Sequence, residues 1–245
     1  MWYDVPMTLR NTAKRVARQL VESRGYYIRH SSVLTYGINY MTDIARIARL
    51  TGAEIRVFFD VGASIGWTSV PALSAFPTAR VIAFEPHPST FAELTAKIGR
   101  HERFEAHNVA VGEISGSAEL FCNGGSRDSF VFADDGARSL TVDCVTIDSF
   151  CRRSGITAID VLKTDTEGFD LSVLKGASDM LASDSVKFVF TEFFQFDHEG
   201  KGTSLTQVAD LLLPLGFSFI ATYCDNVVIE EERLFVCANV LFAKI

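Results

Sequence analysis

The chain has 245 residues, of which 48% are apolar and 22% are charged, and this length allows one sizeable core, or a core with a small helical appendage. Its five cysteines form no Cys-x-x-Cys pair, and their odd number argues against a disulfide framework and indicates a reducing, cytoplasmic compartment. We expect neither a signal peptide nor a membrane span, because arginines interrupt residues 1–30 and the longest uncharged run, 61–79, is rich in Gly, Pro, Ser and Thr.

Charge is unevenly distributed along the chain, although the formal net charge is −7. Residues 1–56 contain nine Lys or Arg and four Asp or Glu, whereas the remaining residues contain fourteen and twenty-six. A basic segment can bind nucleic acid, but these arginines are spread along a helical pattern without interleaved aromatic residues. We therefore expect a solvated helix face and no nucleic-acid partner.

Two amphipathic helices are predicted near the start of the chain, at 11–23 and 41–50, and they define an N-terminal helical cap over residues 1–54. Beyond the cap, short apolar strands alternate with helices, which is typical of an α/β fold with a mostly parallel sheet and helices on both faces. The predicted strands cover 56–61, 81–85, 104–111, 159–165 and 186–194. The predicted helices cover 64–76, 88–98, 171–181 and 205–213.

The C-terminal segment breaks this alternation. Two strand-like runs, 217–222 and 235–243, are joined by a link too short for a crossover helix, so we expect an antiparallel pair. Residues 112–146 contain two alternating runs around a Gly-Gly turn and predict a β-hairpin-like insertion at the edge where ligands bind. The whole of 55–245 is therefore predicted to be one α/β domain that carries this insertion.

A glycine-containing loop follows the first predicted strand. Gly62 and Gly66 allow a sharp turn and a close approach of the backbone to a ligand, and ligands of parallel sheets bind beyond the carboxyl ends of the strands. Glu85 ends the next predicted strand, where a carboxylate can accept hydrogen bonds from both hydroxyls of a ribose. Asn108 follows the third strand and is placed to contact an adenine edge.

Asp60 directly precedes this loop and bears on which cofactor binds. A carboxylate here would repel a pyrophosphate but would favour the ammonium and sulfonium groups of S-adenosylmethionine. The loop also lacks the Gly-x-Gly-x-x-Gly pattern of nicotinamide-binding loops. S-adenosylmethionine is therefore the expected cofactor, while a nicotinamide-dependent oxidoreductase and a purely structural Asp60 remain alternatives.

Three motifs, in chain order, are together similar to those of the FkbM family of methyltransferases, over about residues 57–192. The motifs are Asp60-Val61-Gly62-Ala63-Ser64-Ile65-Gly66, Phe84-Glu85-Pro86 and Lys163-Thr164-Asp165-Thr166-Glu167-Gly168. The last string is the most specific, and Ser64 departs from the asparagine that is usual in the family. A small polar residue should serve the same role there.

The resemblance implies a class I methyltransferase, Rossmann-like fold with a seven-stranded sheet, whose antiparallel C-terminal strand the sequence pattern also predicts. It further implies methyl transfer to a hydroxyl oxygen of a small molecule, such as a natural product or a sugar-bearing compound. The residues that we expect to bind S-adenosylmethionine are Asp60, Gly62, Ser64, Gly66, Glu85, Pro86 and Asn108.

Methyl transfer to a hydroxyl requires a base near the crevice. Lys163 and Asp165 interrupt an apolar central strand and, being two residues apart, point to the same face. Asp165 is the candidate base or acceptor-orienting group, with Lys163 holding its charge, and a buried structural ion pair is the alternative. Glu192, near the end of the next strand, is a third candidate catalytic residue.

A divalent metal is possible at this position but is not favoured, because Asp165 and Glu192 would supply only two oxygen ligands without a visible third. A methyltransferase-like module without catalytic activity also remains an alternative, although buried charges at Lys163, Asp165 and Glu192 argue against it. The predicted partner is a small-molecule hydroxyl acceptor.

Overall fold

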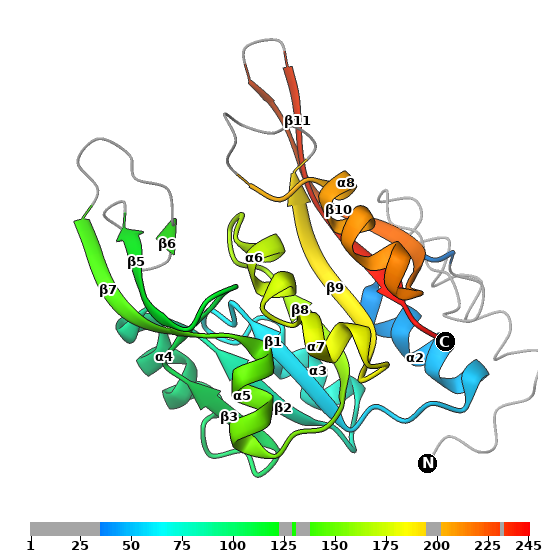
Figure 1. Ribbon diagram of the computed structural model, residues 1–245, viewed down its shortest axis with the longest axis horizontal. Helices are drawn as coiled ribbons and strands as arrows, with labels where there is room; N and C mark the ends of the chain where they lie inside the picture. Colours follow the sequence, from blue (N-terminus) through cyan, green and yellow to red (C-terminus); the bar gives the residue numbers. More distant parts are fainter. Residues whose placement is uncertain (1–34, 123–128, 131–137, 195–201, 231–232) are drawn as a thin grey trace, which may run out of the picture.

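The computed structural model describes residues 35–122, 129–130, 138–194, 202–230 and 233–245. Its main feature is a seven-stranded sheet in the order β10-β11-β9-β8-β1-β2-β3 (Figure 1). The strands are β1 (Val57–Val61), β2 (Arg80–Phe84), β3 (Phe104–His107), β8 (Ile159–Thr164), β9 (Val186–Phe194), β10 (Ser218–Glu230) and β11 (Arg233–Ala243). The first five of these strands are parallel, whereas β11 is antiparallel to both β9 and β10. The predicted class I fold with its reversed C-terminal strand is confirmed.

Helices cover both faces of this sheet (Figure 1). One buried apolar cluster joins the sheet to α2 (Tyr40–Thr51), α3 (Ser69–Ala75) and α4 (Pro88–Ile98). A second cluster joins the opposite face to α5 (Ile147–Ser154), α6 (Asp170–Lys175), α7 (Ser178–Ala182) and α8 (Leu205–Leu212), which a short 3₁₀ turn, η2 (Leu213–Leu215), follows. Successive residues of a strand point to opposite faces, and in β1 Phe58 accordingly belongs to the first cluster and Phe59 to the second.

Helix α2 forms because its ends and its apolar stripe agree. The Asn39 side chain accepts a hydrogen bond from the Thr42 amide at the N-terminus, and Gly52 ends the helix with a left-handed φ of 73°. The buried residues Met41, Ile44, Ile47 and Ala48 share one face. The predicted 41–50 helix is therefore confirmed, whereas the predicted 11–23 helix lies outside the described residues. The division into a 1–54 cap and a 55–245 domain stays a prediction.

Two other helices differ from the sequence prediction. The helix predicted from residue 64 begins only at Ser69, because Ser64 and Gly66 adopt left-handed φ values of 48° and 89°. The predicted 171–181 helix is interrupted at Gly176, where a Cβ would lie 2.0 Å from the carbonyl oxygen of Gly112. Within the ranges that the structure describes, no helix has the length and apolar character needed to cross a bilayer.

A second, four-stranded sheet lies between β3 and α5 in the chain. Its strands are β4 (Ala110–Val111), β5 (Gly116–Cys122), β6 (Ser129–Phe130) and β7 (Arg138–Val145), in the order β4-β7-β5-β6. The two runs predicted as a hairpin are β5 and β7, which pair antiparallel from Gly116 opposite Cys144 to Cys122 opposite Arg138. Figure 1 shows this sheet projecting from the main body at the left of the view.

Candidate active site and cofactor pocket

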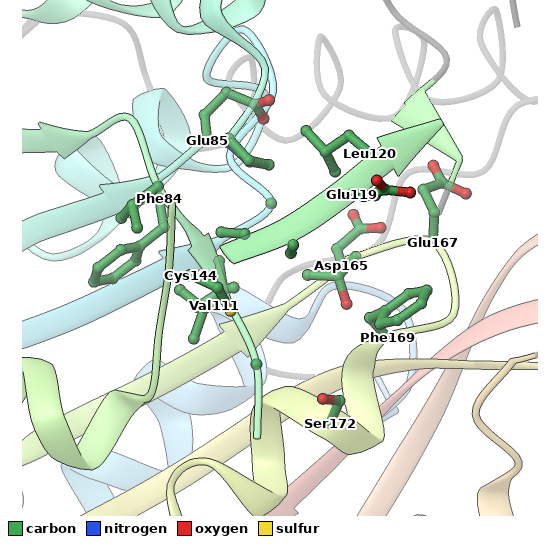
Figure 2. Close-up of a pocket in the computed structure, with 18 of the residues that line it drawn as sticks. Phe84, Glu85, Val111, Glu119, Leu120, Cys144, Asp165, Glu167, Phe169 and Ser172 are labelled. Atoms are coloured by element: carbon green, nitrogen blue, oxygen red, sulfur yellow. The ribbon is translucent and has the colours of Figure 1, made fainter. Parts of the chain in front are cut away.

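A cavity of about 540 Å³ lies at the carboxyl ends of β1, β2 and β8, against the second sheet (Figure 2). This is the edge of a parallel sheet at which ligands are expected, and the volume is within the range of small-molecule sites. The predicted site residues that line it are Gly62, Ser64, Glu85, Pro86 and Asp165. Asp60, Gly66, Asn108, Lys163 and Glu192 do not line it.

The glycine loop after β1 is held close to the loop after β8. Gly62 has a φ of 72°, and a Cβ added to it would fall 1.9 Å from the carbonyl oxygen of Asp165. The amides of Gly62 and Ala63 both donate to the carbonyl oxygen of Phe84, each at 3.0 Å. Only glycine therefore fits at position 62, and the backbone at this point is free to face a ligand without a side chain in the way.

Glu85 lies at the end of β2 and connects two loops beside the cavity. Its Oε2 accepts a hydrogen bond from the Ser64 amide at 2.9 Å, and its Oε1 accepts one from the His87 amide at 3.0 Å. Burial, with 6% of the residue exposed, raises the pKa of the Glu85 carboxyl, and these two amide bonds oppose that rise. The carboxylate keeps lone pairs that can accept from ribose hydroxyls, because each oxygen accepts more than one hydrogen bond.

Asn108 supports this loop from outside the cavity. Its Nδ2 donates to the carbonyl oxygens of Glu85 at 2.8 Å and of Pro86 at 2.9 Å. The side chain thus fixes the turn that presents Glu85, and the predicted adenine contact of Asn108 has no support from its position. Residues Val109 to Gly112, which follow directly, line the cavity instead.

Asp60 and Lys163 form a buried ion pair in the centre of the sheet. The register of β1 and β8 places them opposite one another, and Lys163 Nζ lies 2.9 Å from Asp60 Oδ1. Asp60 Oδ2 also accepts from the Ser69 hydroxyl at 2.6 Å, and Lys163 donates to the carbonyl oxygen of Gly62 at 3.0 Å. Because the Asp60 side chain is fully buried and its charge is compensated by Lys163, the expected attraction of a cationic cofactor to Asp60 stays a prediction without support from this geometry.

Lys163 is also the link between Asp60 and the cavity. Burial by itself would lower its pKa, but the carboxylates of Asp60 and Asp165 outweigh that effect and raise the pKa above its ordinary value. The Lys163 ammonium is therefore charged at neutral pH and lies 3.6 Å from Asp165 Oδ2. The expectation that Lys163 pairs with Asp165 is met, although its shorter contact is with Asp60.

Asp165 is, of the three residues predicted to be catalytic, the one that lines the cavity. Its backbone amide donates to the carbonyl oxygen of Val61 at 3.1 Å, which ties the loop after β8 to the end of β1. Its side chain is 42% exposed and lines the cavity together with Glu119 and Glu167 (Figure 2). Asp165 can thus reach a hydroxyl in the cavity while Lys163 stabilises its charge from below.

Glu192 occupies a different environment from Asp165. It lies in β9 opposite Asn239 of β11, and only 7% of the residue is exposed. The cavity that Asp165 lines does not extend to it. Its predicted catalytic role stays a prediction, without support from the geometry.

Other residues at or near the site were not predicted from the sequence. Asp170, the first residue of α6, is fully buried, and burial raises the pKa of its carboxyl to about 6 while hydrogen bonds from Thr164 and Thr166 oppose the rise. The second sheet contributes Glu119, Leu120 and other lining residues. The sequence provided one indication of these lining residues, because it placed the predicted insertion, 112–146, at the edge of the sheet where ligands bind.

The donor groups present fit S-adenosylmethionine better than a metal ion. Among the residues that the structure describes, no group of three His, Cys, Asp or Glu side chains is arranged to hold a metal. The backbone at Gly62, which tolerates no Cβ, and the Glu85 carboxylate form a cradle suited to a ligand with a ribose. Trp67, 70% exposed, and Pro86 add apolar surface to the same cavity.

Two characterised relatives share part of this sequence. The 2-O-methyltransferase NoeI of Sinorhizobium fredii is 23% identical over 174 residues, which is 64% of this chain and 70% of that protein. The hexuronic acid methyltransferase AglP of Haloferax volcanii is 30% identical over 156 residues, 61% of each chain. The chain thus spans less than two thirds of the second relative's length.

Solved structures with a similar arrangement include the methyltransferase domain of METTL16, with a TM-score of 0.48 and 12% identity over 84% of this chain and 67% of that one. The 1,6-didemethyltoxoflavin-N1-methyltransferase of Burkholderia thailandensis matches with a TM-score of 0.44 and 15% identity, over 98% and 92% of the two chains.

The family model of the methyltransferase FkbM domain matches residues 60–219, which is more than half of the chain and contains both Glu85 and Asp165. The structure places these residues on one cavity at the ligand edge of a class I sheet. The chain belongs to the FkbM methyltransferase family, and its cofactor is S-adenosylmethionine.

Proposed function

We propose that this methyltransferase acts on a hydroxyl oxygen of a small, sugar-bearing acceptor and that Asp165 is the base. The observation that carries the proposal is the exposed Asp165 carboxylate, which shares one cavity with Gly62 and Glu85. The names of the two relatives, a 2-O-methyltransferase and a hexuronic acid methyltransferase, support oxygen as the target and a sugar as the acceptor.

Each residue contributes a separate part of the reaction. When bound, S-adenosylmethionine would supply a methyl group on its sulfonium, and the acceptor oxygen would bond to that methyl carbon while the carbon–sulfur bond breaks and S-adenosylhomocysteine leaves. Glu85 would accept hydrogen bonds from the ribose and fix the position of the cofactor, and the backbone at Gly62 would allow the cofactor to approach. Asp165 accepts the hydroxyl proton, and alignment of the hydroxyl with the methyl group is the main rate effect expected of the protein.

Lys163 and the second sheet complete the proposed site. The Lys163 ammonium lies 3.6 Å from Asp165 Oδ2 and orients that carboxylate at the edge of the cavity. The strands β4 and β5 form the wall of the cavity that faces Asp165, and they are the proposed seat of the acceptor. Because Leu120 and Phe169 also line the cavity, the acceptor would meet apolar surface beside the carboxylates.

The first test separates cofactor binding from chemistry. Calorimetry with S-adenosylhomocysteine and with NADH should show binding of the former alone. Asp165→Asn should bind S-adenosylhomocysteine as the parent does but transfer labelled methyl groups to sugar acceptors at least about tenfold more slowly, since a positioned base contributes about 10²- to 10⁴-fold. Equal turnover of this variant and the parent would remove Asp165 from the mechanism.

A matched control excludes a general effect of the Asp to Asn change. Asp179 lies on α7, is exposed, and pairs with the exposed Arg152 at 3.6 Å, away from the cavity. Asp179→Asn should therefore keep parental turnover and parental binding. A product that carries the new methyl on nitrogen or carbon would contradict the proposed oxygen target while leaving the methyltransferase assignment intact.

A further inference from the structure

The loop between β8 and α6 is held at both ends by elements that are distant in the chain. At its start, the Asp165 amide donates to the carbonyl oxygen of Val61 at 3.1 Å. At its end, the Thr203 hydroxyl donates to the carbonyl oxygen of Gly168 at 3.2 Å and accepts from the Leu171 amide at 2.9 Å. The end of β1 therefore restrains the start of this loop, and the segment before α8 restrains its other end.

Thr203 is itself fixed relative to the main sheet. Only 1% of the residue is exposed, and its carbonyl oxygen accepts from the Phe194 amide at 2.8 Å. An isolated β-bridge between Phe194 and Ser204 docks the same segment at the end of β9. The Thr203 hydroxyl is therefore held in place from its backbone, although the residue does not line the cavity.

Helix α6 depends on this hydroxyl for part of its N-terminal capping. The first amides of a helix have no partner within the helix, and the N-cap residue, Phe169, has no side-chain oxygen that could satisfy them. Thr203 Oγ1 supplies an acceptor to the Leu171 amide from a different element. Because the same hydroxyl donates to the Gly168 carbonyl, it also sets the orientation of the backbone where the loop enters the helix.

The loop needs such a restraint because part of its backbone is unfavourable. Glu167 has a left-handed φ of 53°, a conformation that costs free energy for any residue with a Cβ and persists where the surroundings enforce it. Asp165, Glu167 and Phe169 of this loop line the cavity (Figure 2). Loss of the Thr203 bonds would let the far end of the loop relax, while the bond to β1 still holds its start.

We infer that Thr203 is a positioning residue for methyl transfer, whose hydroxyl holds the loop after β8 so that the Asp165 carboxylate is aimed at the acceptor hydroxyl. The inference rests on the proposed function, because Thr203 acts through Asp165. A displacement of about 1 Å at a reacting group can lower a rate about 100-fold. Loss of the Thr203 hydroxyl should therefore affect turnover more than it affects cofactor binding.

The first experiment compares Thr203→Val, which removes the hydroxyl at nearly constant volume, with Thr203→Ser, which retains it. With labelled S-adenosylmethionine and methyl hexosides and hexuronides as acceptor probes, Thr203→Val should lower kcat about tenfold. The KM for S-adenosylmethionine and the calorimetric affinity for S-adenosylhomocysteine should stay within about twofold of the parent. Thr203→Ser should restore kcat to within about threefold.

Parental kcat in Thr203→Val, or an equal loss of kcat in Thr203→Ser, would overturn the inference. If Thr203→Val does not fold, Thr203→Ala breaks the same two bonds and takes its place in the comparison.

A double variant tests whether Thr203 acts through Asp165. Thr203→Val combined with Asp165→Asn should turn over no more slowly than Asp165→Asn alone, because the carboxylate that Thr203 aims is already absent. Additive losses would show that the two residues act independently and would overturn the inference. Parental turnover in Asp165→Asn by itself would instead contradict the proposed function.

Thr146 provides a matched control for the loss of a helix cap. Its Oγ1 accepts from the Ser149 amide at 3.0 Å at the start of α5, and neither residue lines the cavity. Thr146→Val should lower the melting temperature by an amount similar to that of Thr203→Val but keep parental kcat. A tenfold loss of kcat in Thr146→Val would assign the effect to general destabilisation and would also overturn the inference.

Hydrogen exchange tests the restraint without any acceptor. At saturating S-adenosylhomocysteine, the amides of Gly168 and Leu171 should exchange at least about tenfold faster in Thr203→Val than in the parent. The amides of Gly62 and Ala63, at the other end of the contact between the two loops, should exchange equally in both proteins. Parental exchange at Gly168 and Leu171 would show that Thr203 does not hold the loop.

Discussion

Lys163 is the cation that compensates two carboxylates at the carboxyl edge of the sheet. It is buried and faces Asp60 on one side and Asp165 on the other, and it also donates to the carbonyl oxygen of Gly62. A buried carboxylate without its cation is costly, whereas replacing both members of a pair by apolar groups is often nearly neutral. Asp60 and Lys163 should therefore tolerate joint replacement better than separate replacement.

Removal of Lys163 alone should destabilise the fold strongly. Lys163→Met leaves Asp60 as a buried carboxylate without its cation, so the free energy of unfolding should fall by about 3–5 kcal/mol in urea titrations at pH 7. The double variant Asp60→Leu with Lys163→Met should recover part of that loss. A loss below about 1 kcal/mol in the single variant would mean that the pair does not stabilise the folded state.

Asp170 should give the fold a measurable pH dependence. Its folded pKa of about 6 lies above the ordinary value of 3.8 because of burial, so its contribution to stability is present below about pH 4 and is lost as the pH rises through about 6. Between pH 4 and pH 7, the free energy of unfolding of Asp170→Asn should rise by on the order of 3 kcal/mol relative to that of the parent. Denaturant titrations at several pH values would measure this, and a difference that does not change with pH would contradict it.

The chemistry of single residues was only partly predictable. The sequence indicated that Asp165 and Lys163 share a face, and the structure agrees. It did not indicate that Lys163 faces Asp60, because that contact depends on the register between two strands about a hundred residues apart in the chain. Nor did the sequence indicate that Asn108 holds the Glu85 turn, and the adenine contact of Asn108 stays a prediction.

At the scale of elements, the glycine loop shows why one residue type is required. Gly62 and Gly52 both have left-handed φ values, of 72° and 73°, but a Cβ at Gly52 meets nothing within 4 Å, whereas one at Gly62 collides with the Asp165 carbonyl. Alanine substitutions at these two glycines therefore distinguish the free-energy cost of a left-handed backbone, which both share, from the cost of a steric collision, which only Gly62 has.

Gly62→Ala should abolish measurable binding of S-adenosylhomocysteine, because the loop after β1 or the loop after β8 must move to accommodate the methyl group. Gly52→Ala should leave binding unchanged and should lower the free energy of unfolding by only about 1–2 kcal/mol, the cost of a left-handed non-glycine residue. Calorimetry and thermal melting of both variants test this. Parental affinity in Gly62→Ala would show that the two loops separate without loss of the site.

Element boundaries were harder to predict than the elements themselves. The φ of 48° at Ser64 could not be predicted from the sequence, because serine is rarely left-handed. The helix was therefore predicted to begin at residue 64, five residues before its actual start at Ser69. At the break after α6, a Cβ on Gly176 would lie 2.0 Å from the carbonyl oxygen of Gly112, which belongs to a loop distant in the chain. A close contact of this kind has no local signal in the sequence.

At the scale of the whole molecule, the order of layers followed from the sequence pattern. Alternating strands and helices predicted the parallel sheet, and the short link between the last two strands predicted the reversal at β11. The wall that the second sheet forms against the cavity needed the structure, because only a position near the ligand edge, and no individual contact, could be expected from residues 112–146.

The wall formed by the second sheet contains a cysteine whose reactivity can report whether a ligand is bound in the cavity. Cys144 of β7 is half-buried and lines the cavity, and burial raises the pKa of its thiol, so it should react slowly with maleimide at neutral pH and faster as the pH rises. S-adenosylhomocysteine should slow its labelling several-fold while the exposed Cys224 reacts as before. Peptide mass spectrometry would measure both, and unchanged labelling of Cys144 would place the ligand elsewhere.

The contact between Gly62 and the Asp165 backbone has a consequence for redesign. The loop after β1, which we expect to hold the methyl donor, and the loop after β8, which carries the proposed base, touch with no room for one additional carbon atom, so neither can be rebuilt without moving the other. Variant libraries intended to retarget the enzyme should therefore leave this junction intact and diversify β5 and the start of β4, where new specificity can be introduced at constant donor geometry.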